Sequence, residues 1–347
     1  MNHATPGMQT VLAKLAGRAI EARLRADGRP FVVGLFITHH CMCACESCLW
    51  KHNDWKDVPT DDLKRLFREA KEQGFVAAAI TGGEPFLRRD LGEIVRYVKE
   101  DLDMSILLIT TGWYLKQRMD EVLPWIDMLM LSMDSARPER HDAIRKLPGL
   151  HARLIEGIGL VRERYPALSV QLNTCVQRGL ERDGEVDALL ALSEELGVPI
   201  SFDVITERRN GEEGSAFTLT SMGLPPAEVQ RVCLHLLERK RAGARIMNSE
   251  RYFEYFANGR RGYRCHLPKL AMMVDGRGLV EDCLDLDHPL GDIRTTPLAE
   301  IMASERFRQL RCDAEQCSSC SSPTMVDLSH IWEDPSLVLR PGGLAVG

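Results

Sequence analysis

The sequence lacks the features of proteins that bind nucleic acids or span membranes. Lysine and arginine number 44 against 50 aspartate and glutamate, and aromatic residues make up only 6% of the 347 residues. No basic stripe interleaved with aromatic residues is present, which argues against a nucleic-acid-binding protein. The longest apolar run, 31–37, is far shorter than the roughly 18 residues that a transmembrane helix needs.

A secretory signal is also missing, because the first 30 residues carry charges throughout and contain no apolar segment with a small-residue cleavage site. We therefore expect a cytoplasmic protein. In a reducing compartment, cysteines are more typical of metal sites or catalytic thiols than of disulfides. Four of the 11 cysteines lie within 41–48 and five within 265–320, with a long cysteine-poor segment between them. This distribution predicts two separate metal sites.

Strand-like runs alternate with amphipathic helical patterns over much of the chain. In chain order, the expected strands and helices are 31–38, 60–73, 75–80, 90–101, 104–110, 115–123, 128–132, 139–164, 168–175, 183–196 and 200–205. Six such alternations predict a parallel sheet whose strand C-termini face a shared site. Because a closed barrel of this type has about eight strands, the expected fold class is α/β, a partial (β/α)6 TIM-like barrel.

The segments before and after this alternation are expected to form smaller structural units beside the barrel. Residues 8–26 place apolar side chains on one helical face, which predicts a helix that docks on the core or contacts a membrane surface or lipid-like substrate. A surface loop at 207–215 and a hairpin with its turn at Asp275-Gly276 are also expected. Further helices are expected at 226–241 and 298–310. The expected organisation is an N-terminal helix (1–30), the barrel (31–245), a hairpin-plus-helix domain (246–325) and a tail (326–347).

The stretch CMCACESC directly follows the first expected strand. Cysteine thiolates hold iron–sulfur clusters, and Cys41, Cys45 and Cys48 give a C-x3-C-x2-C spacing on one loop. A 4Fe–4S cluster with three cysteine ligands leaves one iron open to bind a small molecule, and Cys43 is then a spare thiol. A zinc site would instead recruit one of the two histidines that precede the stretch.

This loop resembles the cysteine motif of the radical S-adenosylmethionine (radical SAM) superfamily. Further motifs follow in the order of that superfamily, namely TGGEP (81–85), ITTG (109–112), LSMDS (131–135), ERHDAIR (139–145) and QLNTCV (171–176). The resemblance, which covers roughly residues 31–206, implies a 4Fe–4S cluster that binds S-adenosylmethionine. The residues it implies around this cofactor are Gly82, Gly83, Glu84, Pro85, Thr110, Ser132, Asp134 and Asn173.

The sequence departs from the superfamily pattern at three positions. Met42 stands where the superfamily often has asparagine after the first cysteine. Thr111 stands where it usually has asparagine in the motif at 109–112. Ser47 stands where an aromatic residue usually precedes the third cysteine, and Trp50 is a candidate to replace it. None of these changes removes a cluster ligand.

A second cysteine set lies near the C-terminus. Cys265, Cys283 and the C-x2-C pair Cys317 and Cys320 offer four thiolates, which suit either tetrahedral zinc or an iron–sulfur cluster. The pattern resembles the SPASM/twitch extension of radical SAM enzymes. This resemblance implies a twitch-type domain in which the four cysteines fully ligate a second, auxiliary 4Fe–4S cluster and Cys312 is spare.

The resemblance implies an enzyme that reductively cleaves S-adenosylmethionine to a 5′-deoxyadenosyl radical, which takes hydrogen from an unactivated C–H group. If the auxiliary cluster then relays an electron, the outcome is dehydrogenation, which we favour. If a thiol returns hydrogen, the outcome is epimerisation, with Cys175, Cys43 or Cys233 as donor. Bond formation between carbons or rearrangement is also open. The candidate catalytic residues are Cys175, Asp203 and Glu207.

The expected substrate is a small or lipid-like molecule, because about 30 residues before the first strand leave no room for a peptide-recognition domain. A peptide-modifying maturase is the alternative enzyme class, and a structural zinc or iron–sulfur protein is the non-catalytic one. An electron donor such as flavodoxin or ferredoxin is the expected protein partner.

Overall fold

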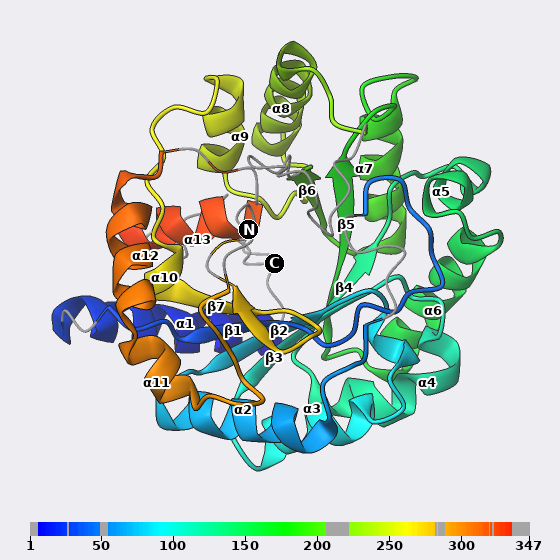
Figure 1. Cartoon of the computed structure of the whole chain (residues 1–347). Helices are drawn as coiled ribbons and strands as arrows, with labels where there is room; N and C mark the ends of the chain where they lie inside the picture. Colours follow the sequence, from blue (N-terminus) through cyan, green and yellow to red (C-terminus); the bar gives the residue numbers. More distant parts are fainter. Residues whose placement is uncertain are drawn as a thin grey trace.

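The computed structural model describes residues 6–25, 28–48, 55–205, 222–281, 283, 289–318, 320 and 323–334. Within these ranges, nine strands form one sheet in the order β6-β5-β4-β3-β2-β1-β7-β8-β9. The first six strands are parallel, with bounds β1 Val32–Phe36, β2 Ala77–Thr81, β3 Ser105–Thr110, β4 Met128–Ser132, β5 Ser169–Val176 and β6 Ile200–Val204. The sheet curls inside a ring of helices without closing (Figure 1), which confirms the predicted partial barrel.

Helices cover the outer face of this sheet, as expected for parallel strands joined by helical crossovers. They are α2 Thr60–Glu72, α3 Leu91–Glu100, α4 Leu115–Val122, α5 Pro138–Arg145, α6 Leu150–Arg164, α7 Glu185–Leu196 and α8 Pro226–Arg241. The single helix expected at 139–164 is divided between α5 and α6. The chain turns there because Lys146 and Gly149 both adopt the left-handed backbone conformation, with φ of 54° and 82°.

Side chains alternate between the two faces of each strand. Leu35, Ile80 and Leu108 face outward, where they belong to the core under the helices. The intervening residues form the inner face of the barrel, and they include Phe36 on β1 and Ile109 on β3. The site residues are therefore to be sought on this inner face and at the C-terminal ends of the strands.

The N-terminal helix α1 (Pro6–Arg25) docks on the N-terminal side of the barrel. Lys14 forms a 3.0 Å ion pair with Asp103, and Arg18 donates to the carbonyl of Gly74 at 3.2 Å, just before β3 and β2 begin. Ala19 is buried with residues of the C-terminal helix. In the parts of the chain that are described, no helix has the length and apolar character needed to cross a membrane.

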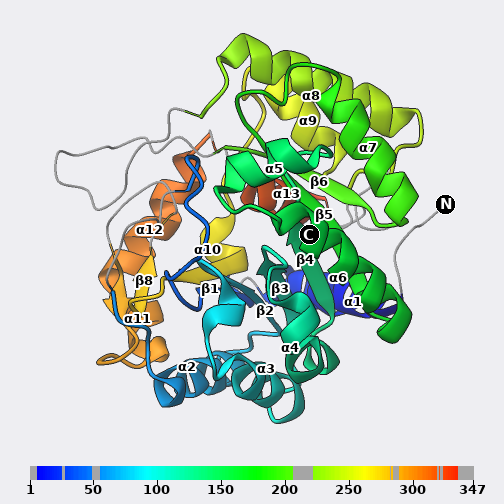
Figure 2. The same ribbon diagram turned by 90° about the vertical axis from the view of Figure 1, so that its right-hand side faces the viewer.

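A hairpin near the C-terminus extends the same sheet. Strand β7 (Ala271–Val274) pairs parallel with β1, and β8 (Leu279–Glu281) returns antiparallel to β7 and pairs with β9 (Gly291–Asp292). The Asp275 carboxylate accepts the backbone N–H groups of Arg277 and Leu279, both at 2.9 Å, which fixes the predicted turn. The flanking helices are α9 Glu250–Ala257, α10 Leu267–Leu270, α11 Leu298–Ala303 and α12 Glu305–Gln316. Figure 2 shows α11 and α12 along the flank of the barrel.

Two expectations about the C-terminal part were wrong. The helix expected at 298–310 is interrupted at Ser304, whose hydroxyl accepts the N–H of Phe307 and so begins α12. Part of the expected tail is the helix α13 (Pro323–Glu333), which packs against β6, α9 and α10. Its Asp327 accepts from the Ser249 hydroxyl at 2.5 Å. Helix α13 therefore covers the open side of the sheet between β6 and β7.

Candidate active site

The cysteine loop lies at the C-terminal end of β1. The Cys43 N–H donates to the Cys41 sulfur at 3.4 Å, and the Cys48 N–H donates to the Cys45 carbonyl at 3.2 Å. A hydrogen bond from the Cys43 thiol lowers the pKa of Cys41, and it lowers the pKa of Cys45 to about 6. The same contacts raise the pKa of Cys43. Because thiolates are the metal-binding form, this arrangement fits cluster ligands at Cys41 and Cys45 and a protonated thiol at Cys43.

The glycines of TGGEP lie directly under this loop. The Gly83 N–H donates to the Thr38 carbonyl at 2.7 Å, and the Glu84 N–H donates to the His40 carbonyl at 2.8 Å. A Cβ atom on Gly82 would lie 2.4 Å from the Thr38 carbonyl oxygen, and one on Gly83 would lie 2.2 Å from the His40 carbonyl oxygen. Only glycine therefore allows the two backbones to approach this closely.

Replacing Gly83 with alanine is expected to displace the backbone next to Cys41 and to destabilise the fold by about 1–3 kcal/mol, the usual cost of overpacking. Gly159→Ala is the matched control, because its Cβ would meet nothing within 4 Å. Denaturant unfolding and S-adenosylmethionine affinity measure the two effects. Equal stability and affinity in the two variants would show that the close approach is unimportant.

Glu84 positions the end of β3 rather than projecting a free carboxylate. Its side chain is fully buried. One carboxylate oxygen accepts the Phe86 N–H and the Thr110 hydroxyl, at 3.0 and 2.7 Å. The other accepts the Thr111 N–H and hydroxyl, at 2.8 and 2.5 Å. Thr111, one of the three residues that depart from the superfamily pattern, thus helps to hold Glu84, while buried Pro85 begins a short 3-10 helix.

A buried ion pair ties the cysteine loop to β4 and β5. The Arg145 guanidinium lies 2.6 Å from the Asp134 carboxylate, and only 14% and 2% of the two side chains are exposed. The other Asp134 oxygen accepts the Cys175 N–H at 3.1 Å. The Arg145 carbonyl in turn accepts the N–H of Ala44 at 3.3 Å and faces the Cys45 sulfur at 3.8 Å. Asp134 is predicted to contact S-adenosylmethionine, and in the structure it holds Arg145, whose carbonyl contacts the loop at the predicted cluster ligand Cys45.

The remaining predicted side chains lie on neighbouring strands. Ser132 is paired with Asn173 across β4 and β5, and Asn173 donates to the Ser201 hydroxyl at 2.9 Å. Cys175 is paired with Asp203 across β5 and β6. Burial raises the pKa of the Cys175 thiol well above its usual value and raises the pKa of Asp203 to about 7. The structure brings these residues together on the inner face. Glu207 and the loop expected at 207–215 lie outside the described residues.

The C-terminal cysteines gather beside β7. The Cys265 N–H donates to the Cys317 carbonyl at 3.0 Å, and the Cys320 N–H donates to the Tyr255 hydroxyl at 2.7 Å. Cys265 and Cys320 pack on one apolar cluster that contains Ala271. Cys283 follows β8, which runs back along β7 toward the level of Ala271. The predicted spare, Cys312, is exposed.

Sequence reasoning missed Trp113, Tyr263 and the role of His39. Trp113 packs beside the cysteine loop, with the Arg153 guanidinium 4.0 Å from its ring centroid. The Tyr263 hydroxyl lies 3.3 Å from the Ser329 hydroxyl, and burial together with the nearby Cys320 and Cys265 thiols raises its pKa. Buried His39 accepts the Gly276 N–H at 2.9 Å, which docks the hairpin turn on the base of the cysteine loop. No local pattern marks these residues, because each is defined by a partner distant in sequence. Trp50 lies outside the described residues.

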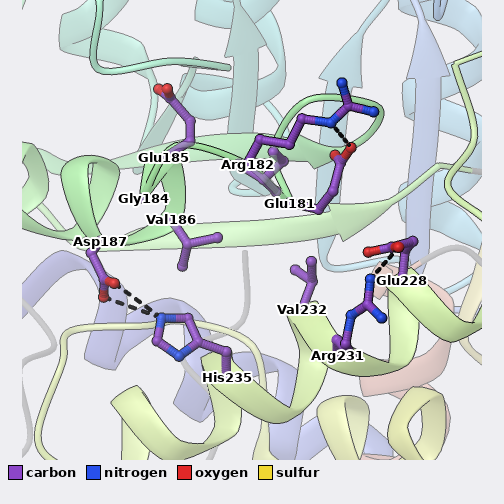
Figure 3. Close-up of a pocket in the computed structure, with 11 residues that line it drawn as sticks. Glu181, Arg182, Gly184, Glu185, Val186, Asp187, Glu228, Arg231, Val232 and His235 are labelled. Atoms are coloured by element: carbon purple, nitrogen blue, oxygen red, sulfur yellow. Dashed lines mark hydrogen bonds and ion pairs between the residues drawn. The ribbon is translucent and has the colours of Figure 1, made fainter.

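A separate pocket lies outside the barrel between α7 and α8 (Figure 3). His235 lies 3.2 Å from the Asp187 carboxylate, and Arg231 pairs with Glu228. These charges offset one another, and the outward-facing α7 and α8 separate this pocket from the inner face. It therefore adds nothing to the candidate active site.

Both cysteine sets offer thiolate sulfurs, which are the usual ligands of iron–sulfur clusters. Within the described residues, no three Cys, His, Asp or Glu side chains converge on one point as a single ion would require. A cubane cluster instead distributes its ligands over different irons. The N-terminal set follows Thr38 and His40, whose carbonyl oxygens pack closely against Gly82 and Gly83.

Comparison with known proteins identifies both parts of the chain. Residues 36–191 match the radical SAM superfamily. The chain belongs to this superfamily. Residues 265–321 match the SPASM iron–sulfur cluster-binding domain, which decides between iron–sulfur and zinc at the C-terminal cysteines. This radical SAM protein is therefore an enzyme whose cofactors are 4Fe–4S clusters and S-adenosylmethionine.

Several curated relatives and solved structures are similar to this radical SAM enzyme. The AdoMet-dependent heme synthase of Methanosarcina barkeri is 26% identical over 90% of this chain and 97% of its own. The GTP 3',8-cyclase of Nautilia profundicola is 29% identical over 51% of this chain and 57% of its own. Streptococcus suis SuiB bound to S-adenosylmethionine has the same fold, with 16% identity, a TM-score of 0.66, and coverage of 85% of this chain and 71% of its own.

Proposed function

We propose that this radical SAM enzyme dehydrogenates a small-molecule or lipid-like substrate at an unactivated C–H group. The observation that supports the proposal is the arrangement around the inner face. The cysteine loop lies at the end of β1, the C-terminal cysteines lie beside the adjacent β7, and titratable side chains lie on β5 and β6. A substrate between them would have a radical source, an electron acceptor and a proton acceptor within one barrel.

The protein supplies the binding and orientation that radical chemistry requires. Cys41, Cys45 and Cys48 would hold the first cluster, and Asp134 and Arg145 fix the loop that carries them. When bound, this cluster and S-adenosylmethionine supply a 5′-deoxyadenosyl radical that takes one hydrogen atom from the substrate. A flavodoxin or ferredoxin is the proposed donor of the electron that this cleavage consumes.

Two further groups complete the dehydrogenation, in which the substrate loses a hydrogen atom, a proton and an electron. Asp203 accepts the proton, because burial raises its pKa to about 7 and a base with a pKa near the working pH is effective. Cys265, Cys283, Cys317 and Cys320 would hold the auxiliary cluster, which when bound would supply an acceptor for the electron. Met273 packs with Cys265 and Cys320 and also lies over Gly34 of β1, so it links the auxiliary cysteines to the inner face.

Two relatives favour a second candidate, the processing of a heme precursor. The heme synthases of Methanosarcina barkeri and Nitratidesulfovibrio vulgaris match 90% and 86% of this chain. A heme precursor is also a small molecule, so this candidate shares the inner face as its site. The two candidates differ in product.

The test uses anaerobically reconstituted enzyme with S-adenosylmethionine, dithionite and fractions of a small-molecule extract, alongside a heme-precursor sample. We expect 5′-deoxyadenosine to rise in one fraction, together with a product lighter by two hydrogen atoms. In deuterated water the new product should carry no carbon-bound deuterium. A product of unchanged mass with one solvent deuteron, lost in Cys175→Ala, would instead establish epimerisation with Cys175 as donor.

A further inference from the structure

Cys320, one of the predicted auxiliary ligands, lies on a short connection between two helices. Helix α12 ends at Gln316 and α13 begins at Pro323, so the backbone N–H and C=O groups of Cys320 belong to neither a helix nor a strand. The residue nevertheless packs against the main core. Backbone groups that are withdrawn from water are nearly always paired, and their partners show what holds this residue in place.

A single hydroxyl on α9 pairs with both backbone groups. Tyr255 accepts the Cys320 N–H at 2.7 Å and donates to the Cys320 carbonyl at 3.0 Å. A phenol has one donor and can accept at the same time, so one side chain is able to make both bonds. Tyr255 is buried, and its ring packs against Phe256 and Tyr263, whose ring centroids lie 4.9 and 5.5 Å away. The packed ring therefore fixes the position of the Cys320 backbone.

Helix α13 holds another part of the same cysteine set through Ser329, which is fully buried. Its hydroxyl accepts the N–H of His266, the residue after Cys265, at 3.1 Å. The same hydroxyl lies 3.3 Å from the hydroxyl of Tyr263. Cys265 is in turn tied to the C-x2-C pair, because its N–H donates to the Cys317 carbonyl at 3.0 Å. Hydroxyl groups from α9 and α13 thus fix the backbone at or beside two of the four predicted ligands.

We propose that Tyr255 and Ser329 are positioning residues of the auxiliary cluster, which hold Cys320 and Cys265 where their thiolates bind iron. A ligand that is already held in place loses little conformational freedom when it binds, which favours retention of the cluster. Both residues act through the backbone of the cysteine segments. The inference is independent of the product that the enzyme forms, because it concerns only how the auxiliary cysteines are held.

The test uses Tyr255→Phe in the anaerobically reconstituted enzyme, since this change keeps the ring and removes only the hydroxyl. Two cubane clusters provide about eight irons, and we expect about four of them to pass to a chelator at least about tenfold faster than in the unchanged enzyme. The electron paramagnetic resonance signal that S-adenosylmethionine does not perturb, which belongs to the auxiliary cluster, should decrease with them. The affinity for S-adenosylmethionine should change by less than about twofold, because the first cluster is a separate site.

Tyr252→Phe is the matched control on the same helix. Tyr252 lies one turn earlier in α9 and is fully buried, but its hydroxyl accepts the N–H of Val204 on β6, at 3.0 Å, instead of pairing with a cysteine. Thermal unfolding of the iron-free variants measures stability separately. Equally fast iron release in Tyr255→Phe and Tyr252→Phe would mean that the hydroxyl only stabilises the fold. That result, or release from Tyr255→Phe at the rate of the unchanged enzyme, would overturn the proposal.

Ser329→Ala tests the second contact and gives an independent answer if Tyr255→Phe does not fold. We expect the same four irons to leave severalfold faster, because the His266 N–H loses its acceptor. Ser304→Ala is the control, since it removes a hydroxyl that also accepts a backbone N–H at 3.1 Å, but at the opposite end of α12 from the C-x2-C pair. Equal iron retention in the two serine variants would contradict the role of Ser329.

Discussion

Cys45→Ala is expected to lose about four of the roughly eight irons that two cubane clusters provide. Formation of 5′-deoxyadenosine should fall by more than the roughly 100-fold typical of changes to residues that merely support a metal ligand. The physical reason is that Cys45 is buried, has its pKa lowered to about 6, and sits where the Arg145 backbone fixes the loop. Iron analysis and chromatographic assay of 5′-deoxyadenosine measure the two losses.

Cys43→Ala is the matched control for this prediction. Cys43 lies in the same loop and is equally buried, but its contacts with Cys41 and Cys45 raise its pKa where that of Cys45 is lowered. We expect the variant to keep its full iron content and to cleave S-adenosylmethionine. Loss of iron in Cys43→Ala with retention in Cys45→Ala would reverse the assignment of the spare thiol.

Asp134→Asn is expected to destabilise the fold by about 3–5 kcal/mol, because it leaves the Arg145 charge buried without its partner. The same change removes a charged acceptor from the Cys175 N–H and loosens the support of the Cys45 backbone. Cluster content and 5′-deoxyadenosine formation should therefore decrease together with stability. Denaturant unfolding of the reconstituted enzyme measures the change in free energy.

Glu156→Gln serves as the control, since it neutralises a carboxylate paired with Lys116 in an exposed ion pair. Such surface pairs contribute only about 0–1 kcal/mol. A similar small effect in Asp134→Asn would mean that the Asp134–Arg145 pair does not hold the site together.

Local patterns in the sequence were sufficient for the order of the six parallel strands and of the helices that join them. The alternating and helical periodicities indicate which residues face the core. Strand β4, for example, has the predicted bounds Met128–Ser132. They failed where backbone conformation intervenes, as at Lys146 and Ser304, because a left-handed residue or a new helix cap does not change the apolar pattern. The helix at 323–333 was missed because its burial comes from contacts with β6 and α9.

The features of the site also fall into those that local sequence patterns specify and those that depend on the tertiary structure. The sequence by itself determined the superfamily, the partial barrel and the two cysteine sets, because the C-x3-C-x2-C loop, the glycine turn and the C-x2-C pair are short local patterns. Only the tertiary structure showed that Glu84 is fully engaged by Thr110 and Thr111, and that His39 docks the hairpin turn at Gly276. It alone also revealed that the Tyr255 hydroxyl pairs with both backbone groups of Cys320. Hydrogen bonding and burial depend on which residues meet in space, and chain folding decides those neighbours across intervals that no local spacing encodes.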